Sequence, residues 1–219
     1  MKSDKVLTKA ELEFTQKLQM HFPCGNIDPA IVQAWNGCPK EFITERILTA
    51  FGKMPEVNML LKRISSFFIQ PESAKFIASD RFKVNTGHEA EVKISYLGDN
   101  FCKWMLNLVE EQPPAEVNLY YHELLKDSVD GPIIKELGGE QKAETTLSEI
   151  FTLMKRQRNG EDGVLLTSGY ANIFYVRGAN GVLRAVSVGW GGDGWDVRAD
   201  SVEDPDRWGA GFQVFASNS

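Results

Sequence analysis

YANIFYVRGANGVLRAVSVGWGGDGWDVRADSVEDPDRWGAGFQVF, residues Tyr170–Phe215, contains most of the strand and turn signals of this chain. Its apolar segments are rich in β-branched residues, and the Asn180-Gly181 pair between two of them is a strong signal for a β-hairpin. We therefore expect a C-terminal β-meander against which the rest of the chain packs. The principal strands expected in it are residues 173–176, 182–188, 195–199 and 212–215.

The N-terminal part of the chain is predicted to form a lobe of three or four short helices. A Thr-x-x-Glu capping box begins at Thr8, and Asp28-Pro29 combines an N-cap residue with a first-turn proline. Apolar residues then recur at helical spacing as far as Ile64. We therefore expect two domains, a helical lobe at 1–66 and an α+β domain at 67–219 that contains the meander.

The segment between the lobe and the meander mixes strand and helix signals. Alternating residues predict strands at Asp80–Val84 and Glu91–Tyr96. Phe101–Val109 and Glu116–Lys126 each fit either a helix or a strand, with the helix slightly favoured for Phe101–Val109. Apolar residues at helical spacing predict a long helix over Gln141–Arg158, and the basic residues of its last turn are expected to compensate the helix dipole.

These elements place the protein in the α+β class. The expected order is a cluster of short N-terminal helices, then a mostly antiparallel sheet with one long helix, and finally the β-meander. With 219 residues, of which 42% are hydrophobic, the chain is long enough to bury a substantial core.

Charge and composition limit the classes of partner. The formal net charge of −6 argues against a nucleic-acid partner, because domains that bind phosphate groups of nucleic acids usually carry a basic face. No apolar run approaches the ~20 residues that span a membrane, and no signal peptide is apparent, so no membrane association is expected. An odd number of cysteines, 3, predicts a reducing cytoplasmic location without a disulfide framework.

No complete catalytic, metal or cofactor motif is present in the sequence. A structural zinc site needs four ligands, usually in two close pairs, and no phosphate-binding loop precedes a helix. We therefore expect no cofactor and no metal, and no catalytic residue is identified. The histidines and cysteines that a nucleophilic or metal site would use are His21, Cys24, Cys38, His88, Cys102 and His122.

The tryptophans of the meander are the best candidates for a binding site. Set among glycines and aspartates, they could form an aromatic platform beside which arginines stack. The alternative is that they bury against the helices, so their exposure decides between a site and a scaffold. The predicted binding residues are Trp190, Asp193, Trp195, Arg198 and Trp208.

Four stretches carry a resemblance to a known group of proteins, namely DGPIIKELGGE (130–140), AETTLSEIF (143–151), NGEDGVLL (159–166) and ANIFYVRGANGVLRAV (171–186). In this order they resemble uncharacterised bacterial proteins with similar C-terminal halves, over roughly residues 70–216. The resemblance implies a bacterial, independently folding unit and assigns no activity, substrate or partner.

The function predicted from these observations is a non-catalytic binding or protein-interaction module for a protein or a small polar ligand. One alternative is a hydrolase that uses carboxylates between Asp193 and Asp206, or a set formed by His88, Cys102 and His122. A weaker alternative is association with DNA through the N-terminal helices, which could contain a helix-turn-helix.

Overall fold

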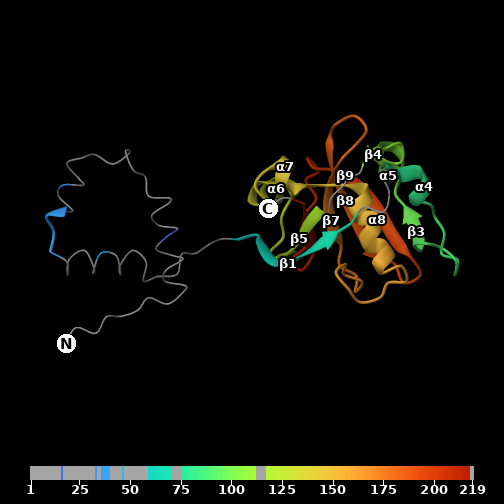
Figure 1. Ribbon diagram of the computed structural model, residues 1–219, viewed down its shortest axis with the longest axis horizontal. Helices are drawn as coiled ribbons and strands as arrows, with labels where there is room; N and C mark the ends of the chain where they lie inside the picture. Colours follow the sequence, from blue (N-terminus) through green and yellow to red (C-terminus); the bar gives the residue numbers. More distant parts are fainter. Residues whose placement is uncertain are drawn as a thin grey trace. The chain divides into compact units, whose positions relative to one another are not determined.

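The described part of the chain is organised around one mixed β-sheet of eight strands (Figure 1). The computed structural model describes residues 59–70, 75–111 and 117–217, with Gln16, Gln33, Asn36–Pro39 and Arg46 as isolated positions. The chain divides into two compact units, Met1–Val57 and Asn58–Ser219, and the sheet belongs to the second.

The elements of this unit are mostly short. They are β1 (Leu61–Ile69), β2 (Lys75–Ile77), α4 (Ala78–Arg81), β3 (Ile94–Leu97), α5 (Asp99–Met105), β4 (Val109–Glu111), β5 (Val117–Leu124), α6 (Asp130–Glu136), α7 (Glu140–Ala143), β6 (Glu144–Thr145), α8 (Leu147–Arg156), β7 (Asn172–Arg177), β8 (Leu183–Trp190), β9 (Trp195–Ser201) and β10 (Gln213–Ala216).

The strand order of the sheet is β1-β5-β10-β7-β8-β9-β3, with β6 also paired to β7. The consecutive strands β7, β8 and β9 pair antiparallel. The hairpin predicted at Asn180-Gly181 joins the first two, and Gly181 adopts the left-handed φ of 76° that such a turn requires. The last strand leaves this meander, because β10 returns to lie between β5 and β7.

The fold class predicted from the sequence is wrong. The described residues are mostly β, and their sheet is mixed because β10–β7, β9–β3 and β6–β7 all pair in parallel. Among these residues no cluster of helices precedes β1. Most of the predicted lobe at 1–66 falls outside the described residues. The last residue of its final predicted helix face, Ile64, lies instead on β1, at a bulge between the residues of that strand that pair with β5.

The long helix predicted over Gln141–Arg158 is also wrong. Thr145 interrupts it by pairing with β7, and its Oγ1 donates to the Tyr175 carbonyl oxygen at 3.1 Å. Thr146 then caps α8, since its side chain accepts the Glu149 N–H at 3.2 Å while the Glu149 carboxylate accepts the Thr146 N–H at 2.9 Å. Two consecutive β-branched residues favour the extended backbone that separates α7 from α8.

The structure also decides the secondary structure of three segments between the predicted lobe and the meander. The predicted strand Asp80–Val84 is wrong, because α4 covers its start and the buried Phe82 packs on Phe101 with ring centroids 5.0 Å apart. Phe101–Val109 is mainly helical through α5, and Glu116–Lys126 contains β5. No helix in the described ranges is long and apolar enough to cross a membrane.

The core lies between the sheet and α8. Alternate residues of β9, such as Trp195 and Val197, bury on the same side as Val186 and Val188 of β8 and join the apolar residues of α8 in one cluster. Figure 1 shows α8 in front of these strands. We call this side of the sheet the α8 face.

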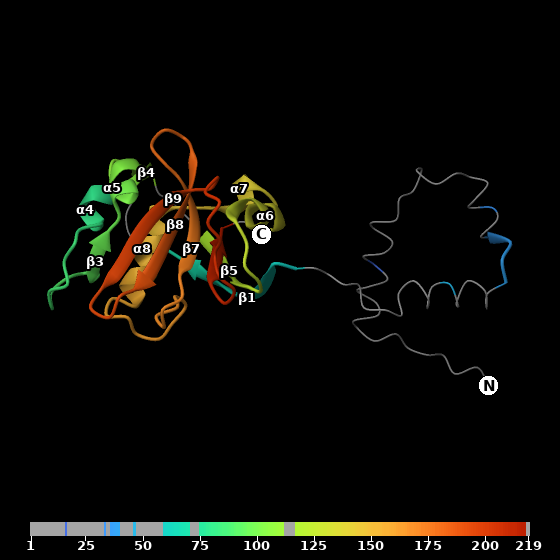
Figure 2. The same cartoon turned by 180° about the vertical axis from the view of Figure 1, so that it is seen from behind.

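The opposite side of β8 and β9 carries polar residues, and we call it the open face. It presents Asp196, Arg198 and Asp200 from β9, with Ser187 and Gly189 beside them on β8. In Figure 2 the strands lie in front of α8, and in the described part of the chain no helix crosses the front of β8 and β9. The helices α6 and α7 cover the neighbouring strands on this side, around Ile173 and Tyr175.

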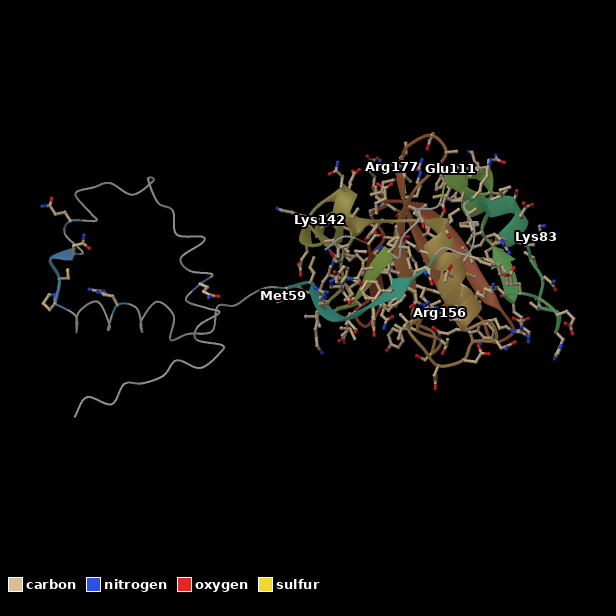
Figure 3. All side chains as sticks on the ribbon, viewed as in Figure 1. Met59, Lys83, Glu111, Lys142, Arg156 and Arg177 are labelled. Atoms are coloured by element: carbon tan, nitrogen blue, oxygen red, sulfur yellow. The ribbon has the colours of Figure 1, made fainter. Side chains whose placement is uncertain are left out.

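The basic end of α8 makes structural contacts. Lys155 forms an ion pair with Glu91 at 2.9 Å. Arg156, labelled in Figure 3, donates to the Phe68 carbonyl oxygen at 3.3 Å and lies 5.8 Å from the centre of the Phe67 ring. These cations also lie in the last helical turn, where positive charge complements the helix dipole.

Candidate functional site

The polar row of β9 leads to two cavities on the open face of the sheet. Asp196, Arg198 and Asp200 alternate with the buried Trp195, Val197 and Ala199 along the strand, so their side chains share one face. Asp196 and Arg198 line one cavity, and Asp200 lines the other.

The first cavity, which we call the acidic cavity, has a volume of about 200 Å³. It lies where the start of α6, the end of β9 and the loop between β9 and β10 meet. Carboxylates dominate its lining, with one indole and one guanidinium. The lining residues are Asp130, Asp200, Asp204, Asp206, Arg207 and Trp208.

Asp130 forms the buried base of the acidic cavity and is only 2% exposed. Its Oδ1 accepts a hydrogen bond from the Tyr175 hydroxyl at 2.7 Å and another from the Trp208 indole N–H at 2.7 Å. Burial raises the pKa of the Asp130 carboxyl, against the lowering effect of these two donors. The buried Tyr175 hydroxyl in turn has a raised pKa, chiefly through burial and secondly through the Asp130 charge.

The loop that carries Trp208 is fixed to the segment before α6. Trp208 and Ser128 exchange backbone hydrogen bonds of 2.8 and 3.1 Å. The Ala210 N–H donates to the Asp127 carboxylate at 2.9 Å, and the Asp206 N–H donates to Asp204 Oδ1 at 2.9 Å. The carboxylates of the loop are therefore held beside Asp130 by backbone contacts.

No ion pair within the described ranges neutralises the aspartates of the acidic cavity. None of its four aspartates forms an ion pair with a described residue, Arg207 included. Burial raises the pKa of Asp200, and the nearby charge of Asp204 raises it further, although the nearby Arg198 charge lowers it. The described residues contain no group of three or more side chains able to hold a metal ion.

The second cavity, which we call the aromatic cavity, has a volume of about 240 Å³. Tyr170 and Phe212 meet edge to face at this cavity with centroids 6.0 Å apart, and Trp190 also lines it, although its ring packs on the α8 face. Phe212 also contacts Trp208, at a centroid distance of 6.3 Å, so a chain of rings joins the two cavities. The lining residues are Gly169, Tyr170, Ala171, Ser187, Gly189, Trp190, Gly191, Asp196, Arg198 and Phe212.

Local contacts hold the wall of the aromatic cavity in place. The Trp190 ring packs edge to face on Trp195 at 5.3 Å and against Gly160, where a Cβ atom would lie 2.2 Å from the indole. Asp196 Oδ1 accepts the Ser95 hydroxyl at 2.8 Å. Arg198 lies 3.9 Å from Asp196 Oδ2 and 5.0 Å from the centre of the Tyr96 ring.

The structure distributes the five predicted binding residues over different places. Trp190 and Arg198 line the aromatic cavity, whereas Trp208 lines the acidic cavity. Trp195 is 0% exposed, and its indole N–H donates to the Gln157 carbonyl oxygen at 3.1 Å. Asp193 is exposed in the turn between β8 and β9 and lines neither cavity.

Sequence reasoning missed several residues of these cavities, among them Asp130, Tyr170 and Phe212. Asp130 precedes Gly131-Pro132, which signals a helix start, and nothing in its own neighbourhood indicates that it meets the loop at Trp208. Such contacts between residues 78 positions apart arise only from the sheet topology.

The structure does not bring Cys102 and His122 together. The Cys102 thiol lies near β3, 3.9 Å from the Leu97 carbonyl oxygen, whereas His122 is buried on β5. Five strand spacings of ~4.8 Å separate β3 from β5, which puts the two side chains on the order of 20 Å apart. His88 is exposed in the turn before β3, and His21 and Cys24 lie outside the described residues.

Comparison of the chain with protein-family models, with curated protein sequences and with solved structures found no match.

Proposed function

We propose that this protein is a cytoplasmic, non-catalytic binding protein whose acidic cavity accepts the cationic group of an organic ligand. The observation that carries the proposal is the set of four aspartates without an ion pair among the described residues, at the base of which Asp130 is almost fully buried. A partly desolvated ammonium or guanidinium group gains Coulomb energy from each of these carboxylates that is ionised. The Trp208 indole adds a surface against which such a cation packs.

A titration with small cations tests this proposal. N-acetyl-lysine amide and N-acetyl-arginine amide are expected to bind with a Kd on the order of 1 mM, as measured by NMR chemical-shift changes. N-acetyl-norleucine amide, which has an apolar side chain without the charge, is expected not to bind. The shifts are expected at Asp200 and Trp208, which line the acidic cavity.

Matched variants locate the binding. Asp200→Asn is expected to weaken the cation affinity about five-fold through loss of one nearby charge. Asp193→Asn makes the same charge change on an exposed turn outside both cavities and is expected to leave the affinity unchanged. Equal affinities for lysine and norleucine amides, or equal effects of the two variants, would count against the proposal.

The affinity for a cation is expected to rise with pH. Burial raises the pKa of Asp130 and Asp200, so both carboxyls keep their protons at a pH where exposed aspartates are ionised. A cation binds the ionised forms, and binding therefore strengthens over the range in which the pH rises from the ordinary aspartate pKa through the raised pKa values of these two carboxyls. Calorimetry in buffers of different ionisation enthalpy should also detect proton release on binding at the lower pH. An affinity that stays constant over this range would show that these carboxyls do not contact the cation.

A carboxylate-dependent hydrolase is the second candidate, and the raised pKa of Asp130 supports it. A general acid must hold its proton at the pH of the reaction, and burial raises the pKa of the Asp130 carboxyl in that direction. The two candidates differ in turnover. Hydrolysis of p-nitrophenyl glycosides or esters by the native protein, lost in Asp130→Asn, would favour the hydrolase. If the native protein binds the cation but hydrolyses these substrates no faster than Asp130→Asn does, the result would favour the binding protein.

A further inference from the structure

The two cavities lie on one face of one strand, and this arrangement restricts the class of ligand. Asp200 at the acidic cavity and Asp196 at the aromatic cavity are four residues apart on β9 and point to the same side. An extended strand rises ~3.3 Å per residue, so these positions are about 13 Å apart. The rings of Trp208, Phe212 and Tyr170 run alongside this interval.

We propose that the ligand is an extended peptide that places a lysine or arginine in the acidic cavity and an aromatic side chain in the aromatic cavity. This inference rests on the proposed function, since the basic side chain occupies the site assigned there. In an extended peptide, residues i and i+4 point to the same side and lie about 13 Å apart, which matches the spacing along β9.

The two linings differ in the way that such a peptide requires. The acidic cavity contains four carboxylates and only one arginine among its lining residues. This excess of negative charge selects a positively charged group. The aromatic cavity presents the rings of Tyr170 and Phe212, and ring pairs are favourable in the edge-to-face geometry that these two already adopt. Tyr170 is 45% exposed, so its ring is open to a partner.

Charge complementarity favours a basic peptide over other macromolecules. The open face presents Asp196 and Asp200 from β9 next to the carboxylates of the loop, and the whole chain has a net charge of −6. Nucleic acids and anionic membranes would be repelled by these carboxylates. Arg198, which lies between Asp196 and Asp200, carries donors that suit the carbonyl oxygens of a peptide backbone.

A pair of isomeric peptides tests the spacing. Acetyl-Lys-Gly-Ser-Gly-Trp-amide carries the two side chains at i and i+4, whereas acetyl-Lys-Trp-Gly-Ser-Gly-amide has the same composition with the side chains adjacent. We expect the first peptide to bind at least about ten-fold more tightly than N-acetyl-lysine amide, because the second contact becomes intramolecular. The second peptide is expected to bind no more tightly than the amide, since adjacent residues of an extended chain point to opposite sides.

A matched pair of variants assigns the gain to the aromatic cavity. Tyr170→Ala is expected to remove the ten-fold gain while leaving the affinity for N-acetyl-lysine amide unchanged. Tyr120→Ala, the same change on β5 outside both cavities, is expected to keep the gain. Thermal denaturation of both variants confirms that they are folded.

The outcomes separate this inference from the proposed function. Equal affinities of the two peptides, or a gain that persists in Tyr170→Ala, would overturn the peptide assignment while the amide still binds. Failure of the amide to bind would overturn the proposed function and, with it, the assignment of a peptide ligand.

Discussion

A Trp195→Ala variant is expected to lose about 3–5 kcal/mol of unfolding free energy, the usual cost of truncating a buried aromatic side chain. Trp195 is 0% exposed, lies on the α8 face of β9 and packs against Trp190. Its removal leaves a cavity and also leaves the Gln157 carbonyl oxygen without its indole donor. Urea denaturation followed by circular dichroism would measure the loss.

The matched control for this variant is Asp193→Ala, two residues away on the exposed turn. It is expected to change the unfolding free energy by less than about 0.5 kcal/mol. A Trp195→Ala variant of native stability with weakened ligand binding would restore the binding role that the sequence predicts for Trp195. The expected result, a large loss of stability, identifies it as part of the scaffold.

Replacing Glu149 by glutamine is expected to remove a pH-dependent loss of stability. Burial raises the pKa of Glu149 from its ordinary value of 4.5 to about 7, although Thr146 and Ser217 donate hydrogen bonds to it. The folded protein therefore holds this proton more tightly than the unfolded chain. Its contribution is complete below about pH 4.5 and is lost as the pH rises to about 7, by about 3 kcal/mol.

Glutamine keeps the shape of the side chain and can still accept the Thr146 N–H in the capping box. The Glu149→Gln variant should therefore match the native protein near pH 4.5 and exceed its unfolding free energy near pH 8. The same substitution at Glu89, whose side chain is 97% exposed, is expected to leave the pH profile as it is. If Glu149→Gln and the native protein lose stability in parallel between these pH values, Glu149 is not the source of the effect.

Local signals in the sequence were sufficient for the hairpins of the sheet. The Asn180-Gly181 turn is a property of two residues, and its conformation does not depend on distant parts of the chain. The alternation of Trp195, Val197 and Ala199 with polar neighbours likewise follows from the two-residue period of a strand. Such features can be predicted because each is decided within a few positions.

The errors arose where partners distant in sequence decide the structure. Leu61 and Ile64 have helical spacing, yet they lie on β1 because β5, more than fifty positions later, provides a pairing edge. Thr145 interrupts a helical pattern because β7 offers it a strand to join. The helix and strand propensities of individual residues predict secondary structure poorly where such pairing with a distant strand is available.

In the candidate site, too, some features follow from local sequence and others depend on contacts between distant residues. Trp190, Arg198 and Trp208 were predicted as binding residues from their setting among glycines and aspartates, and each lines one of the two cavities. Their separation into different cavities, and the burial of Asp130 behind Trp208, follow from the path of the loop between β9 and β10. That path is fixed by backbone contacts with the segment before α6, for which a single sequence carries no signal.

The position of β10 in the sheet has a consequence for biosynthesis. Among the described residues, it lies between β5 and β7 and is the only strand that joins β1 and β5 to the remaining strands of the sheet. A nascent chain therefore exposes the pairing edges of β5 and β7 until Gln213–Ala216 leave the ribosome. Unpaired edges invite association with other chains, so a chain in which β10 has not yet joined the sheet is expected to aggregate more readily than the complete sheet.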